Sequence, residues 1–201
     1  MRRTALTLLL VVLGPLMLTS CFHDPVSLSF EGGFEGGDLS AWQTGADVPE
    51  DPNNPGNPVA WAIEASSERA ETGQRSARFF LDGRQDDGTI WLARPFDVPP
   101  NAQLNVSLSF QLWSQTASMA NEITQASVYA GPSAPQAESD FNTERPGYRV
   151  AGWDAYRYQL AAQSGSDGQL WVAVGINVVW ETEVTHYLDD VQIEMEQPGL
   201  F

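Results

Sequence analysis

The chain has no lysine, one cysteine and two histidines among its 201 residues. A single cysteine, Cys21, excludes an intramolecular disulfide and a multi-thiolate metal site. The two histidines, His23 and His186, are too few for a multi-histidine zinc site, and a Ser-His-Asp triad would have to use His186. The sequence also lacks a G-x-S-x-G, an H-E-x-x-H and a phosphate-binding loop. We therefore expect no catalytic residues and no enzymatic activity.

Basic residues are also scarce. Ten arginines stand against 26 acidic residues, which gives a formal net charge of −16 at pH 7. Such a surface repels nucleic acid and anionic lipid head groups, so neither is expected as a partner. An acidic surface is compatible with a cation, a neutral polymer or a basic protein patch as partner. The alternative is that the acidic residues serve only to keep the protein soluble.

The N-terminus has the layout of a secretory signal. Two arginines, Arg2 and Arg3, precede an apolar run over 5–18 that is shorter than the ~20 residues of a membrane span. The run ends in Leu18-Thr19-Ser20-Cys21, which resembles the lipobox of bacterial lipoproteins. The resemblance implies a signal peptide over 1–20, lipidation of Cys21 and a tether over 21–25. The alternatives are an uncleaved anchor or an ordinary signal peptide. We expect an exported protein whose lipid is its only contact with the membrane, at the outer membrane or cell surface.

The rest of the chain has the pattern of short strands separated by turns. Residues 103–113 show five alternations in a row between apolar and polar side chains, which is typical of a half-buried strand. Further strands are expected over 26–30, 59–65, 76–81, 89–96, 126–130, 153–160, 170–179 and 187–195. Loops rich in proline and glycine are expected over 45–58 and 131–147, and at most a short helix over 65–73. The pattern predicts one all-β domain over 26–196, an antiparallel β-sandwich or jelly roll of eight or nine strands, with a tail over 197–201.

The two ends of this domain carry a family resemblance. Its beginning reads Phe34-Glu-Gly-Gly-Asp-Leu-Ser-Ala-Trp42, and its end reads Tyr187-Leu-Asp-Asp-Val-Gln-Ile-Glu-Met195. Together they resemble galactose-binding-like jelly rolls, the fold of many carbohydrate-binding modules and of MAM-type adhesion domains. The resemblance implies that Trp42 and Trp153 are packing tryptophans.

The same resemblance implies a structural calcium ion where the first and last strands meet. Its ligands here would be Glu35, or Glu31 because the F-E-G-G segment is duplicated, together with Asp189. Strand parity independently places Asp189 on the face of Val191 and Ile193, where an ionised carboxylate needs a partner such as a hard cation. The alternative is that Asp189 lies at the rim of the sandwich and accepts hydrogen bonds from backbone amides or water.

Seven tryptophans in one small domain suggest a sugar-binding face. Strand parity places several aromatic and amide side chains on polar faces, opposite the apolar residues of their strands. If these strands were neighbours in one sheet, they would form one groove from Gln111, Trp113, Tyr129, Trp171 and Asn177. The alternative is that these aromatics are buried, for example beneath the long loops.

Two non-enzymatic functions fit these features. The first is a surface lipoprotein that binds a glycan through the aromatic and amide face. The second is a MAM-like adhesion or assembly module that binds another surface protein. A polar-rimmed groove favours the first function, whereas a flat apolar patch, or contact between the loops at 45–58 and 131–147, favours the second.

Overall fold

The computed structural model describes residues 27–83, 88–117, 124–179 and 182–198. These residues form eleven strands and one 3₁₀ turn at Glu138–Asp140. The strands are β1 (Ser27–Gly32), β2 (Gln43–Asp47), β3 (Trp61–Ser66), β4 (Ser76–Gly83), β5 (Thr89–Asp97), β6 (Gln103–Ser114), β7 (Thr124–Gly131), β8 (Asn142–Pro146), β9 (Gly152–Gln163), β10 (Gln169–Val178) and β11 (Thr182–Glu196). The all-β class is confirmed.

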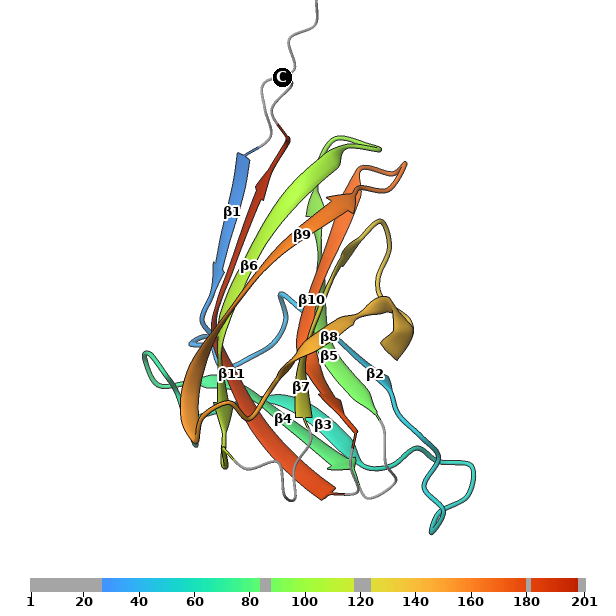
Figure 1. Ribbon diagram of the computed structural model, residues 1–201, viewed down its shortest axis with the longest axis vertical. Coiled ribbons are helices and arrows are strands. Elements are labelled where there is room, and N and C mark those ends of the chain that lie inside the picture. Colours follow the sequence, from blue (N-terminus) through green and yellow to red (C-terminus); the bar gives the residue numbers. More distant parts are fainter. Residues whose placement is uncertain (1–26, 84–87, 118–123, 180–181, 199–201) are drawn as a thin grey trace, which may run out of the picture.

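The strands form two antiparallel sheets packed face to face (Figure 1). The first sheet has the order β3-β4-β11-β6-β9, and β1 pairs with the second half of β11. The second sheet has the order β2-β5-β10-β7-β8. The sequence prediction of an antiparallel β-sandwich with jelly-roll character is therefore confirmed.

One core fills the space between the sheets. Along β6, Leu104, Val106, Leu108, Phe110 and Leu112 are buried, while the residues between them face outward. Along β10, the alternate residues from Leu170 to Val178 complete the core from the other sheet. Every strand from Ser27 to Glu196 belongs to one of these two sheets, so this part of the chain carries its own core.

All nine predicted strands are present, but two further strands, β2 and β8, were predicted as parts of loops. Both lie at the edges of the second sheet, where one side of a strand needs no partner and a weak hydrophobic pattern suffices. Pro146 at the end of β8 is compatible with an edge position only. The short helix allowed over 65–73 is absent: residues 65–66 end β3, and residues 67–75 form the connection to β4 without helix.

β11 changes its neighbour halfway along. Residues 182–188 pair with β4, and residues 191–196 pair with β1. Between them the register with β6 shifts by a β-bulge, at which Asp190 has a φ of 49°. A bulge inserts an extra residue and reverses the side-chain alternation beyond it. This bulge determines which residues of β11 face outward.

The outer face of the second sheet is covered by the segment 132–141. Phe141 packs against Trp91 and Tyr129, with ring centroids 5.0 and 6.0 Å apart. The Tyr129 hydroxyl donates to the Ser133 carbonyl at 2.8 Å. Trp91 is only 4% exposed as a result. Side chains on this face therefore form a second, small apolar cluster beneath a loop.

Candidate functional site

The outer face of the first sheet is open and hollowed. One hollow encloses about 210 Å³ and crosses β9, β6 and β11. It is lined by Ser107, Leu108, Ser109, Arg157, Tyr158, Gln159, Gln192 and Glu194. A second hollow of about 130 Å³ adjoins it and shares Ser109, Arg157 and Gln192. We call these the first and second hollows.

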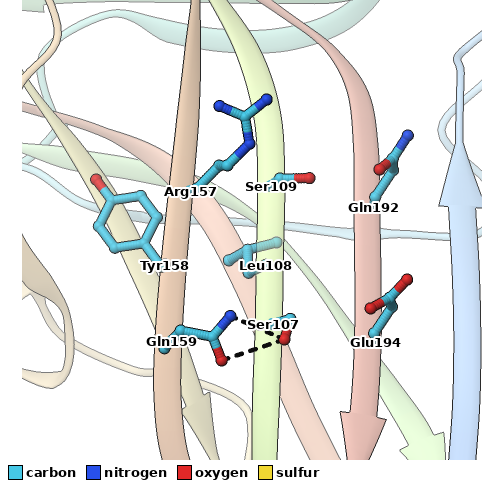
Figure 2. Close-up of a pocket in the computed structure, with 8 residues that line it drawn as sticks. All are labelled: Ser107, Leu108, Ser109, Arg157, Tyr158, Gln159, Gln192 and Glu194. Atoms are coloured by element: carbon cyan, nitrogen blue, oxygen red, sulfur yellow. Dashed lines mark hydrogen bonds between the residues drawn. The ribbon is translucent and has the colours of Figure 1, made fainter.

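Strand register arranges the polar side chains of this face in crosswise rows. One row contains Arg157, Ser109 and Gln192, and the next contains Gln159, Ser107 and Glu194. Figure 2 shows the two rows one above the other, with Leu108 and Tyr158 between them. These rows combine hydroxyl, amide, guanidinium and carboxylate groups, so the face can both donate and accept hydrogen bonds.

Two side chains in the first hollow are already bonded to each other. The Gln159 amide nitrogen donates to the Ser107 hydroxyl oxygen at 2.9 Å, and the Ser107 hydroxyl lies 3.2 Å from the Gln159 amide oxygen (Figure 2). This pair holds the Gln159 amide in place before a ligand arrives. A preorganised polar group loses less conformational entropy on binding.

Aromatic residues lie at one end of this face. Trp113 and Trp153 are direct register partners on β6 and β9, and both are half-buried. The Arg69 guanidinium lies 3.9 Å from the centroid of the Trp113 ring, and Tyr187 meets the same ring edge-on at 5.5 Å. Trp153, which we expected to pack inside the domain, thus shares the outer face with Trp113.

The five predicted groove residues do not form one groove. Gln111 and Trp113 lie on β6 in the first sheet, whereas Tyr129, Trp171 and Asn177 lie on β7 and β10 in the second. The two sets face outward on opposite sides of the core. Parity assigned each side chain to a polar face correctly, but parity does not identify the sheet to which a strand belongs.

The three residues on the second sheet are partly or wholly covered. Asn177 is buried, and its side-chain nitrogen donates to Thr89 Oγ1 at 2.9 Å and to Glu138 Oε2 at 2.6 Å. Tyr129 and Trp171 pack around the small cluster beneath the segment 132–141. In this structure, Asn177 anchors the 3₁₀ turn rather than facing solvent.

The prediction that Asp189 shares a face with Val191 and Ile193 is wrong, because the bulge lies between Asp189 and these two residues. Asp189 pairs with Gln111 and so shares the outer face with Tyr187, but Val191, Ile193 and Met195 point into the core. Its carboxylate accepts backbone N–H groups from Glu71 at 2.9 Å, Thr72 at 3.3 Å and Asp190 at 2.9 Å. Burial raises the pKa of the Asp189 carboxyl, while these hydrogen bonds act to lower it.

Glu35 has a similar role on the same connection. Its carboxylate accepts the backbone N–H groups of Gln74 and Arg75 at 3.0 and 2.9 Å. Glu31 is exposed on β1, in register with Gln192. The two bonded carboxylates therefore fix the β3–β4 connection to the two ends of the domain.

This arrangement does not fit a calcium ion held by Glu31 or Glu35 and Asp189. A calcium site needs converging oxygen ligands, but the backbone groups that face Glu35 and Asp189 are N–H donors. In the part of the chain that the structure describes, no three acidic, histidine or cysteine side chains are grouped to hold a metal. Chelation tests the calcium site that the sequence resemblance implied.

Most of the hollow was missed by sequence reasoning. The alternation over 103–113 predicted a polar face that contains Ser107 and Ser109, but neither serine, nor Arg157 on β9, was predicted as a site residue. Gln192 and Glu194 alternate with the apolar residues of β11 but were not predicted as site residues, because the strand order that places them beside β6 is a long-range property. The alternation of β9 between buried Tyr156 and Tyr158 and exposed Arg157 and Gln159 was the available signal.

The signal peptide, Cys21 and the tether lie outside the described residues. Within the described ranges, no helix is long and apolar enough to cross a membrane.

Comparison with solved structures finds the same fold in glycan-related proteins. The tandem domain CBM22-1–CBM22-2 of Paenibacillus barcinonensis Xyn10C matches with a TM-score of 0.51 and 15% identity, over 91% of this chain and 49% of that one. The arabinose-bound α-L-arabinofuranosidase MgGH51 matches with a TM-score of 0.53 and 11% identity, over 78% of this chain and 23% of the enzyme. TmCBM61 in complex with β-1,4-galactotriose matches with a TM-score of 0.48 and 13% identity, over 83% and 94% of the two chains.

No family model matches the sequence. No curated protein matches it either. At these identities the structural similarity establishes the fold and nothing finer. The chain shares the β-sandwich fold of the CBM22 tandem domain.

Proposed function

We propose that this protein is a non-catalytic, lipid-anchored receptor of the cell envelope that binds a glycan on the outer face of its first sheet. The observation that carries the proposal is the pair of adjoining hollows crossed by rows of hydroxyl, amide and charged side chains. Sugar rings present hydroxyl groups at their edges, and such groups need both donors and acceptors. The fold shared with carbohydrate-binding modules is compatible with this use.

The aromatic end of the face supports the same function. Tryptophan rings stack on the apolar C–H faces of sugar rings, and Trp113 and Trp153 lie side by side in register at the end of the polar rows. Arg69 occupies one face of the Trp113 ring, so Trp153 is the better candidate for stacking. Trp113 and Gln111 then contribute at the rim of the second hollow, which Gln111 lines.

A binding role rather than catalysis is favoured by the position of His186. It is 0% exposed, and its Nδ1 lies 3.0 Å from the Trp113 carbonyl oxygen. This histidine therefore cannot reach a substrate on the outer face, where it would be needed as a general base.

The membrane anchor is proposed from the sequence alone. The Leu18–Cys21 segment resembles a lipobox, and acyl chains on Cys21 would hold the domain at the envelope. A Cys21→Ala variant expressed in a bacterial host should move from the membrane fraction to the soluble fraction and lose incorporation of labelled palmitate. Retention of both in the variant would contradict lipidation.

Glycan binding is tested with residues 22–201, which contain every strand of both sheets. We expect binding to at least one glycan on a broad array, and loss of that binding when Gln192→Ala and Gln159→Ala are combined. Circular dichroism and the melting temperature check that the double variant remains folded. Wild-type protein that is folded but binds no glycan would contradict the proposal.

One contact favours protein binding as a second candidate function. The Glu138 backbone N–H donates to Asp47 Oδ2 at 2.8 Å, which joins the segments around 45–58 and 131–147 into one surface. However, Val150 at 40% exposure is the one large hydrophobic side chain exposed in the described residues, so these segments offer no flat apolar patch. Specific capture of a surface protein that is lost on changing 132–136, but not on changing the hollows, would favour this alternative.

A further inference from the structure

We propose that the face selects glycans in which single anionic sugars, bearing a carboxylate or a sulfate ester, are separated by neutral ones. Arg157 binds the anionic group, and the acidic residues on either side exclude a second anion. This inference rests on the proposed glycan-binding function and specifies its ligand class.

Arg157 is an unusual cation in this chain. Five of the six other arginines that the structure describes are engaged: Arg78 pairs with Glu64 at 3.0 Å, Arg149 pairs with Asp154 at 2.6 Å, and Arg69, Arg94 and Arg145 lie over aromatic rings. The sixth, Arg75, lines neither hollow. Arg157 is exposed and has neither a carboxylate nor an aromatic ring as a partner among the described residues. In a protein with 26 acidic residues, a guanidinium left without an acidic partner is available to a ligand.

The position of Arg157 is central to the site. It lines both hollows, and it shares a crosswise row with Ser109 and Gln192, which also line both (Figure 2). A planar guanidinium binds carboxylate or sulfate oxygens with two parallel hydrogen bonds. The hydroxyl and amide of the same row can then bond the ring oxygen and hydroxyls of the same sugar.

Acidic side chains lie on both sides of that row. Glu194 lines the first hollow and Asp190 lines the second. Adjacent rows on one face of a strand are ~7 Å apart, a spacing comparable with one sugar unit. Carboxylates accept sugar hydroxyls but repel a second anionic group. An anion opposite Arg157 is therefore stabilised, whereas anions on the neighbouring sugars are not.

The binding test uses residues 22–201, two matched pairs of polymers and polygalacturonate. Glucuronoxylan, which carries scattered uronic acids, is compared with the same polymer after carboxyl reduction, and polygalacturonate represents contiguous acids. A lightly sulfated galactan and its desulfated form distinguish sulfate from carboxylate recognition. We expect the scattered anionic form of at least one pair to bind about tenfold more tightly than its neutral form, and polygalacturonate to bind weakly.

Two variants assign the effect to the face. Arg157→Gln should remove the preference, so that the variant binds the anionic and neutral forms of each pair with equal affinity. Arg145→Gln changes the net charge equally but lies on β8 in the other sheet, so it should keep the preference. Glu194→Gln should strengthen binding to polygalacturonate.

The outcomes separate this inference from the proposed function. Equal binding to the anionic and neutral forms, or equal effects of Arg157→Gln and Arg145→Gln, would overturn the selection of anionic sugars while leaving glycan binding intact. Absence of binding to every polymer by folded protein would contradict the proposed function itself.

Discussion

The guanidinium of Arg69 lies 3.9 Å from the centroid of the Trp113 ring and covers one face of it. A cation over an indole ring at an exposed site contributes about 0.5–1 kcal/mol. We therefore expect Arg69→Ala to lower the free energy of unfolding by that amount and to make tryptophan fluorescence more accessible to acrylamide. Urea unfolding and quenching measure both effects.

A double-mutant cycle tests the Arg69–Trp113 contact directly. When Trp113 is already replaced by Leu, Arg69→Ala should have little further effect on stability, because the ring is gone. Additive effects of the two substitutions would show that the stacking contributes nothing.

Asp189, beside the bulge, accepts hydrogen bonds from three backbone amides, so its replacement should lower the free energy of unfolding. In Asp189→Asn, one carboxylate oxygen becomes an amide nitrogen that faces N–H donors. We expect a loss of about 1–3 kcal/mol in urea unfolding.

Asp190→Asn is the matched control for this substitution. Asn tolerates the positive φ at this position, and among the described residues the Thr72 hydroxyl alone donates to the Asp190 side chain, at 2.6 Å. It should lose less than about 1 kcal/mol. Equal losses in the two variants would contradict the role given to Asp189.

The raised pKa of Asp189 predicts a pH dependence. Because burial raises the pKa in the folded protein, the folded state holds this proton more tightly than the unfolded state. Relative to Asp189→Asn, the wild type should thus gain stability as the pH falls from the raised pKa towards the ordinary value of 3.8, and change little above that window. Urea unfolding of both proteins between about pH 3.5 and 7 measures the difference. A difference that is constant with pH, or of opposite slope, would contradict the assigned shift.

Calcium removal tests the metal prediction. Since the amides of the β3–β4 connection already donate to Glu35 and Asp189, we expect a chelator to leave the melting temperature and glycan binding unchanged. A lower melting temperature in chelator that calcium restores, together with loss of the effect in Asp189→Asn, would instead show that these carboxylates hold the ion.

The sequence was most informative where one face of a strand is strictly apolar. The five alternations of β6 predicted both its burial pattern and the polarity of its outer face. The burial pattern of β11 was harder to predict, because a bulge at Asp190 reverses the alternation of its side chains. This bulge lies where β11 exchanges β4 for β1 as its neighbour, which is a long-range feature. The groove prediction failed for a related reason: strand order is a long-range property, so Trp113 and Trp171 could be assigned to polar faces but not to opposite sheets.

The most direct test of the account is to fill the hollows and measure glycan affinity. Ser109 lines both hollows, whereas Asn105, on the same face of β6, lines neither. We predict that Ser109→Trp abolishes binding to the glycan identified on the array, while Asn105→Trp binds it as the wild type does, with both variants folded. Wild-type affinity in Ser109→Trp would contradict the assignment of the binding site to this face.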